Sequence, residues 1–149
     1  MVYVDTSVIV KLYIKEKYSR GASNWLKANN EAIPLTSFHE LEFINALQLK
    51  RFRTEATPQT ILQIVARFEE HEKKGIYYRP PLDWPTVFTR AVELSQKHSG
   101  TLGSRALDIL HVASAVAIKA DRFLTLDDRQ SSLAAHAGLE IINIIQTAK

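Results

Sequence analysis

The sequence contains no cysteine, which excludes disulfide bonds, cysteine-ligated zinc and catalysis by a thiol. Long hydrophobic runs are also missing. The longest, residues 112–118, includes a serine and is far shorter than the roughly 20 residues that a membrane-spanning helix needs. The N-terminus shows no secretory signal, because its short apolar run soon meets an acid at Asp5. We therefore expect a cytoplasmic protein that does not span a membrane.

The chain likewise has no internal repeat, no low-complexity segment and no linker rich in glycine and serine. Its 149 residues suit one domain. A domain of this size buries about two-thirds of its unfolded surface and needs no covalent staples. We therefore expect residues 1–149 to form a single domain. The formal net charge of +3 is compatible with a polyanionic partner but is weak evidence for one.

Segments typical of strands alternate with segments typical of helices. Valine, isoleucine and aromatic residues predict short buried strands at residues 2–5, 32–35, 76–78, 122–126 and 139–143. Capping residues and apolar spacing predict helices at residues 6–13, 19–29, 38–50, 58–74, 84–98, 105–119 and 131–137, with a loop at 99–104. The helix at 105–119 is apolar nearly all round and should be the most buried. This alternation predicts a parallel sheet with helices on both faces.

Four carboxylates stand where an unpaired acid is unfavourable. Asp5 and Asp127 each follow a short apolar run, at the carboxyl end of a predicted strand, where parallel sheets bind their ligands. Glu42 and Asp108 lie inside apolar helical stretches. Four acids that converge would repel each other, and a divalent cation removes that cost, because hard cations such as Mg²⁺ prefer carboxylate and water oxygens. The pattern therefore predicts a metal-dependent phosphodiesterase.

Each acid also has an ordinary structural explanation. Asp5 can cap the helix that follows it, and Asp108 can answer the positive end of a helix dipole. Glu42 can be a solvated helix residue, and Asp127 can belong to a turn. These explanations compete with metal binding for each acid separately, but they are harder to hold for all four acids in this order.

The sequence resembles the PIN domain family, and most of all the small stand-alone PIN proteins that act as VapC-type toxins of type II toxin–antitoxin systems. The segments that carry the resemblance are Val4-Asp5-Thr6-Ser7, Glu42 on its helix, residues 105–113 (RALDILHVA) and residues 124–129 (LTLDDR). The sequence Gly138-Leu139-Glu140 before the last strand also fits, so the resemblance runs from the first residues to about residue 143.

The resemblance implies a PIN-like α/β/α sandwich with a central parallel sheet of about five strands, and one acidic pocket that binds Mg²⁺ or Mn²⁺ and cleaves RNA. It assigns catalytic and metal-coordinating roles to four acids: Asp5, Glu42, Asp108 and Asp127. It assigns supporting hydrogen bonds to Thr6 or Ser7, and to Thr125 beside Asp127. The Thr-x-Asp spacing selects Asp127 as the fourth acid and leaves Asp128 as a supporting group or a helix cap.

Such a site suits hydrolysis of RNA phosphodiester bonds by a metal-activated water. Bound divalent ions lower the pKa of the water and clamp the attacking and leaving oxygens. One ion and two ions are both compatible with the sequence. The expected products carry a 5′-phosphate and a 3′-hydroxyl, and DNA is not excluded as a substrate because no ribose hydroxyl takes part.

Several residues near these motifs have two explanations each. His111 is expected to be a packed, hydrogen-bonded core residue rather than a catalyst. Arg105 shares a helix face with Asp108. Three roles are open for it: to orient that carboxylate, to form a plain salt bridge with it, or to reach a phosphate. Lys50, Arg51 and Arg53 form a basic cluster that either tracks an RNA backbone or is a solvated helix end. A second basic stretch, near Asp5, comprises Lys11, Lys15, Lys17 and Arg20.

The resemblance further implies a small antitoxin partner that blocks the pocket, and a homodimer. Three other functions stay open. The first is a PIN-type nuclease that processes RNA without an antitoxin. The second is a PIN-like module that binds RNA without cutting it, against which the intact set of acids argues. The third is a phosphatase of another α/β fold with Asp5 as nucleophile, but it would want a second Asp where this chain has Ser7.

Overall fold

The chain begins with a fully buried strand, and parallel strands follow it through the sequence. In the computed structural model, which describes residues 1–145, the strands are β1 (Val2–Val4), β2 (Ile33–Pro34), β3 (Tyr77–Tyr78), β4 (Arg122–Leu124) and β5 (Glu140–Ile142). The helices are α1 (Thr6–Tyr13), α2 (Ser19–Ala28), α3 (Ser37–Phe52), α4 (Pro58–Lys73), α5 (Trp84–Leu94), the π-helix η1 (Ser95–Ser99), α6 (Gly100–Leu102), α7 (Ala106–Ala117) and α8 (Asp128–His136). Every strand pair is parallel, which confirms the predicted α/β class. Within residues 1–145, no helix is long and apolar enough to cross a membrane.

The five strands pair as two sets, β1-β4-β5 and β2-β3. On either side of Pro34, N–H groups of the chain donate to carbonyls near β3, at 2.9 and 2.8 Å. At residue 34 the backbone N–H would point the other way, toward β1, but proline has no N–H. On the β1 side, the Val4 carbonyl accepts a hydrogen bond from His39 Nε2 at 2.9 Å. β2 therefore lies beside β1 without ladder hydrogen bonds, in the spatial order β3-β2-β1-β4-β5.

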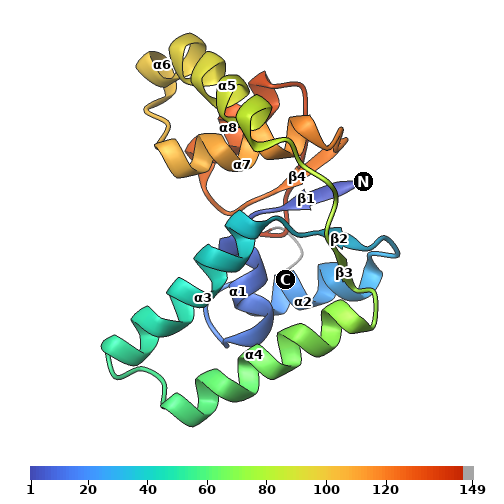
Figure 1. Ribbon diagram of the computed structural model, residues 1–149, viewed down its shortest axis with the longest axis vertical. Coiled ribbons are helices and arrows are strands. Elements are labelled where there is room, and N and C mark those ends of the chain that lie inside the picture. Colours follow the sequence, from blue (N-terminus) through green and yellow to red (C-terminus); the bar gives the residue numbers. More distant parts are fainter. Residues whose placement is uncertain (146–149) are drawn as a thin grey trace.

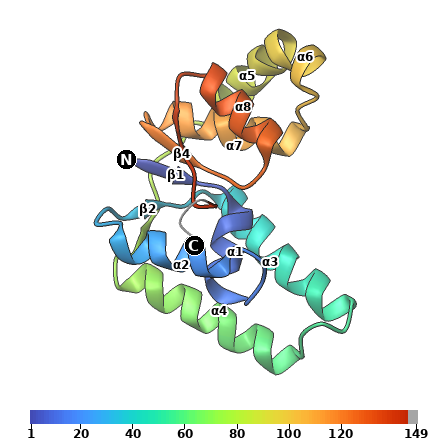
Figure 2. The same ribbon diagram turned by 180° about the vertical axis from the view of Figure 1, so that it is seen from behind.

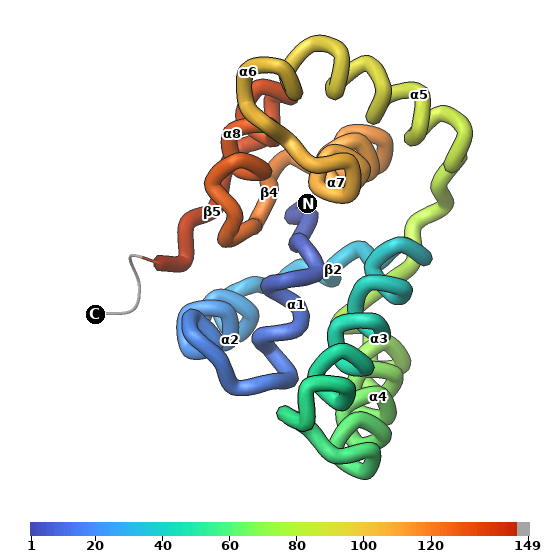
Figure 3. Tube along the Cα trace, turned by 90° about the vertical axis from the view of Figure 1, so that its left-hand side faces the viewer, coloured from blue at the N-terminus to red at the C-terminus, as the bar shows by residue number. Residues whose placement is uncertain are grey.

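Alternation along β1 and β4 divides the hydrophobic core into two clusters. Val4 and Leu124 pack in one cluster, whereas Tyr3 and Phe123 pack in the other, because successive strand residues point to opposite faces. Figures 1 and 2 show α1–α4 on one side of β1 and β4, and α5–α8 on the other. Figure 3 shows the start of the chain between α1 and α7. Helices therefore cover both faces of the strands, as predicted.

One predicted loop is largely helical. The expectation of a loop at 99–104 is wrong for residues 99–102, because α5 continues into η1 and α6 before the chain turns at Gly103. Gly100 has a helical φ of −63°, and only Gly103, with φ of 65°, uses the left-handed region that glycine favours. The last helix starts earlier than predicted, at Asp128, since Asp127 caps it.

Two glycines provide a matched test of the packing. We expect Gly21→Ala to lower the free energy of unfolding by about 1–3 kcal/mol, the cost of overpacking, because its Cβ would lie 2.8 Å from the carbonyl oxygen of Ile144. Gly100→Ala should be neutral or stabilise the fold by up to about 1 kcal/mol, since nothing lies within 4 Å of its Cβ. Urea denaturation measures both changes. An equal effect of the two substitutions would contradict the close approach of α2 to the segment after β5.

Candidate functional site

Two of the predicted acids sit at the ends of neighbouring strands. Asp5 follows β1 and caps α1, with Oδ2 accepting from the N–H of Ser7 at 3.1 Å. Asp127 comes shortly after β4 and caps α8, with Oδ1 accepting from the N–H of Gln130 at 2.9 Å. Because β1 and β4 pair in parallel, both acids reach the same edge of the sheet. Both residues are therefore helix caps. Capping uses one oxygen of each carboxylate, and the second oxygen contacts other side chains.

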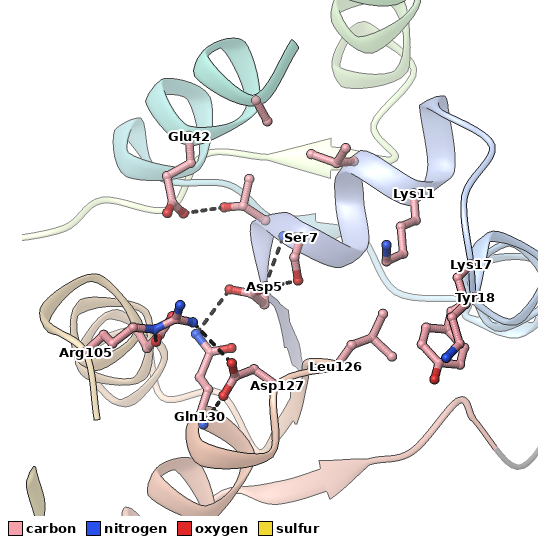
Figure 4. A pocket seen from close by; sticks show the side chains of 14 residues that line it. Asp5, Ser7, Lys11, Lys17, Tyr18, Glu42, Arg105, Leu126, Asp127 and Gln130 are labelled. Carbon is pink, nitrogen blue, oxygen red and sulfur yellow. Dashed lines mark hydrogen bonds and ion pairs between the residues drawn. The ribbon is translucent and has the colours of Figure 1, made fainter. Parts of the chain in front are cut away.

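Helices bring the other two acids to the same place. Glu42 lies in the second turn of α3 and Asp108 in the first turn of α7. All four acids line one pocket of about 550 Å³, part of which Figure 4 shows. The side chains of Asp5, Asp108 and Glu42 are 10%, 17% and 26% exposed, and that of Asp127 is 37% exposed. The four acids thus converge on one pocket, and Glu42 is not an ordinary solvated helix residue.

Glu42 is held by side chains from α1 and α7. Thr6 Oγ1 donates to Glu42 Oε1 at 2.8 Å, and His111 Nε2 contacts the same oxygen. Burial tends to raise the pKa of Glu42. The hydrogen bond and charge of His111, with the hydrogen bond from Thr6, outweigh the effect of burial, so the pKa of Glu42 lies below its usual value. The other ring nitrogen of His111 pairs with the Tyr3 hydroxyl at 2.8 Å. His111 is buried and hydrogen-bonded, as predicted, and its Nε2 also lies 3.4 Å from Asp5 Oδ1.

Arg105 links the remaining two acids. Its Nε donates to Asp108 Oδ2 at 2.7 Å. Its Nη2 donates to Asp127 Oδ2 at 3.1 Å, and Figure 4 shows these two side chains pointing toward each other. The side chain is 67% exposed, so solvent screens these pairs and each contributes at most about 1 kcal/mol. The salt bridge to Asp108 is one of the expected roles of Arg105, whereas the second bond joins two segments that are distant in sequence.

The predicted supporting residues differ in what they contact. Ser7 Oγ donates to Asp5 Oδ2, while the neighbouring Thr6 supports Glu42 instead, as described above. Thr125 Oγ1 accepts from the N–H of Asp127 at 3.1 Å. Asp128 is exposed, begins α8 and does not line the pocket. The pocket therefore contains Asp127 and not its neighbour, in agreement with the Thr-x-Asp spacing.

Gln130 is a site residue that the sequence analysis missed. Its side chain is buried, its Nε2 donates to Asp5 Oδ1 at 3.1 Å, and its Oε1 accepts from Thr125. It thereby ties α8 to the end of β1. A signal existed, because a glutamine three residues after a cap is typical of a helix start. That signal predicts a local contact, however, and the amide reaches Asp5 on another element.

The pocket offers oxygen donors, the type that Mg²⁺ and Mn²⁺ prefer. These donors are the four carboxylates and the hydroxyls of Thr6 and Ser7. Within residues 1–145, no three His, Asp or Glu side chains already form a metal-binding group. The acids instead contact Arg105, His111 and Gln130. The donor chemistry thus fits a hard divalent cation.

The basic cluster at the end of α3 lies away from this pocket. Lys50, Arg51 and Arg53 are not among the residues that line it. Lys50 forms ion pairs with Glu16 and, at 3.3 Å, with Glu55. Arg51 and Arg53 are exposed. The structure therefore does not bring these predicted RNA-binding residues to the acids, and basic residues from the α1–α2 segment line the pocket instead.

Two comparisons with known proteins found a match. A family model described as PIN domain matches residues 2–136, a span that includes all four acids. The crystal structure of FitAcB from Neisseria gonorrhoeae is similar to this chain, with a TM-score of 0.68 over 97% of this chain and 98% of that chain. The sequence identity is 15%, so this likeness shows the fold alone. No curated protein matches the sequence significantly.

Proposed function

This chain belongs to the PIN domain family, and we propose that it is a single-domain endoribonuclease, the VapC-type toxin of a type II toxin–antitoxin system. Proteins of this family are generally nucleases. The observation that carries the proposal is the convergence of four carboxylates, from two strand ends and two helices, on one open pocket. Strand direction and capping account for Asp5 and Asp127, but neither accounts for Glu42 and Asp108, on α3 and α7, lining the same pocket.

In this proposal, the residues that hold Mg²⁺ or Mn²⁺ are Asp5, Glu42, Asp108 and Asp127. When bound, the ion supplies a water of lowered pKa and positive charge for the phosphate. Residues of the chain keep the carboxylates in place: Ser7 and Gln130 hold Asp5, and Thr6 holds Glu42. The low pKa of Glu42 keeps it ionised at neutral pH, which is the form that binds a cation.

Arg105 contacts the substrate in this proposal. Its guanidinium contacts Asp108 and Asp127, yet most of the side chain is exposed. A planar guanidinium binds phosphate oxygens in pairs, so Arg105 is suited to orient the phosphodiester at the mouth of the pocket. The exposed Arg51 and Arg53, with Lys50, would contact the RNA backbone further from the cleaved bond.

An antitoxin, a second copy of the chain and a cytoplasmic location complete the proposal, on the strength of the family resemblance. Large apolar side chains that are exposed on α3 and α4 offer a protein partner apolar surface to bury. These side chains are Leu41, Leu49, Phe52 and Leu62.

The proposal predicts metal-dependent cleavage of RNA by the purified chain, free of any partner. Total cellular RNA is incubated with Mg²⁺, with Mn²⁺ and with EDTA, beside an Asp108→Asn variant. We expect discrete fragments with 5′-phosphate ends in either metal and none in EDTA or with the variant. RNA that is bound but uncut in both metals would overturn the proposal in favour of a binding module. Cleavage by a chain encoded without a neighbouring antitoxin would favour RNA processing.

A further inference from the structure

The wall of the pocket that faces the acids is basic and aromatic. Lys11, Lys17 and Tyr18, from the end of α1 and the turn before α2, line the same pocket. Figure 4 shows Leu126 between Asp127 and this wall. The proposed function uses the acids and Arg105 but gives no role to these three side chains.

The backbone at Tyr18 is in the left-handed region, with φ of 70°. This conformation is unfavourable for a bulky residue, and glycine or asparagine is the usual occupant. The surrounding turn holds it. The N–H of Ser19 donates to the Glu16 carbonyl at 3.1 Å, and the Glu16 carboxylate is ion-paired with Lys11 at 3.0 Å and with Lys50. The turn is therefore held by specific interactions, and it sets the direction of the Tyr18 side chain.

Neither packing nor hydrogen bonding explains why a tyrosine stands there. Tyr18 belongs to neither hydrophobic cluster. Within residues 1–145, its hydroxyl has no hydrogen-bond partner and Lys17 has no carboxylate partner. The two side chains contact each other, because Lys17 Nζ lies over the Tyr18 ring, 4.8 Å from its centroid. An aromatic ring and an unpaired cation are thus presented together to the pocket.

We propose that Tyr18 and Lys17 form a nucleotide-binding subsite, in which the Tyr18 ring stacks on an unpaired base beside the cleaved bond and Lys17 contacts its phosphate. This inference rests on the proposed function and adds the two residues that hold the nucleotide next to the cleaved bond. Stacking on an aromatic side chain requires a base that is free of its own helix. The side chain of Leu126 lies between the acids and the ring (Figure 4), so a nucleotide chain that joins the two would pass over it.

Binding without cleavage tests the subsite separately from catalysis. The probe is a fluorescein-labelled RNA of about 12 uridines, within the span of one single-strand binding site, in EDTA. We expect Tyr18→Gly to weaken binding about fivefold or more, the effect of losing one stacked base, and Tyr18→Phe to bind as wild type does. An abasic probe of the same length, which keeps the phosphates but has no base to stack, should bind wild type and Tyr18→Gly equally.

Thr54→Gly is the matched control, because Thr54 also has a positive φ, of 59°, but does not line the pocket. Both glycine variants should raise the melting temperature, and only Tyr18→Gly should lose affinity. The subsite is refuted if Tyr18→Gly binds the intact probe as wild type does, if the loss is equally large on the abasic probe, or if wild type does not bind the intact probe. If the subsite is refuted but wild type still cleaves RNA with metal, the proposed function stands. If wild type binds the probe as expected but cleaves no RNA, the proposed function is wrong and the subsite stands.

Discussion

Replacing Asp5 by Asn is expected to lower metal-dependent RNA cleavage by about 100-fold or more and to leave the fold intact. The carboxylate is a proposed metal ligand, and a bound divalent ion stabilises the transition state by several kcal/mol, which corresponds to at least about 100-fold in rate. Asparagine keeps an oxygen for the N–H of Ser7 and is itself a favoured helix cap. Loss of one negative charge from the acidic pocket should leave the metal-free protein as stable as wild type or more stable.

The matched control for Asp5→Asn is Asp128→Asn, which removes the same charge from an exposed residue outside the pocket. Initial rates on a substrate identified from the RNA fragments, with thermal melting in EDTA, compare the two variants. We expect wild-type cleavage from Asp128→Asn. Full activity of Asp5→Asn would remove Asp5 from the mechanism, and an equal loss in both variants would point to net charge rather than to a ligand.

Replacing Phe43 by Ala is expected to lower the free energy of unfolding by about 3–5 kcal/mol, the usual cost of truncating a buried aromatic side chain. Phe43 is 1% exposed, stacks on Phe68 with ring centroids 4.3 Å apart, and meets the edge of Tyr13 at 5.3 Å. These contacts join α3 to α4 and α1. The loss is a large part of the total stability of an ordinary domain, which is about 5–15 kcal/mol.

Leu41→Ala is the control for Phe43→Ala, because both lie on α3 but Leu41 is 67% exposed. Its effect should stay within about 0.5 kcal/mol. The midpoint of urea denaturation measures both variants. Because Glu42 stands between the two residues, Phe43→Ala should also reduce cleavage at temperatures where it remains folded, whereas Leu41→Ala should not. A small loss of stability from Phe43→Ala would mean that α3 is not anchored through this aromatic cluster.

The class of the fold and the position of two acids could be predicted from local sequence patterns alone. Short apolar runs alternate with amphipathic segments, and only parallel strands with helices on both faces satisfy that alternation. Asp5 and Asp127 follow such runs, so their place at one edge of the sheet is a consequence of strand direction. The buried middle of α7 was likewise readable, because residues 109–115 are small or apolar nearly throughout and all are buried, although Leu107 beside Asp108 is 55% exposed.

Other features depend on contacts between distant residues, which a local pattern does not encode. Arg105 is local to Asp108, but only the packing of α7 beside α8 brings it to Asp127. Gln130 reads as part of a helix start, and only the approach of α8 to β1 takes its amide to Asp5. The glycines at 99–104 suggest a loop, yet the chain stays helical to Leu102.

The division of the strands into two sets shows the same limit. Pro34 is visible in the sequence, but only the tertiary structure shows that its missing N–H faces β1, where His39 takes up the Val4 carbonyl. The conformation of Tyr18 is a second example. Its left-handed backbone lies in a turn where Glu16 is ion-paired with two lysines on other elements, and these pairs form only when the elements pack. Local sequence chooses helices and strands, whereas the partners of a side chain are chosen by how those elements pack.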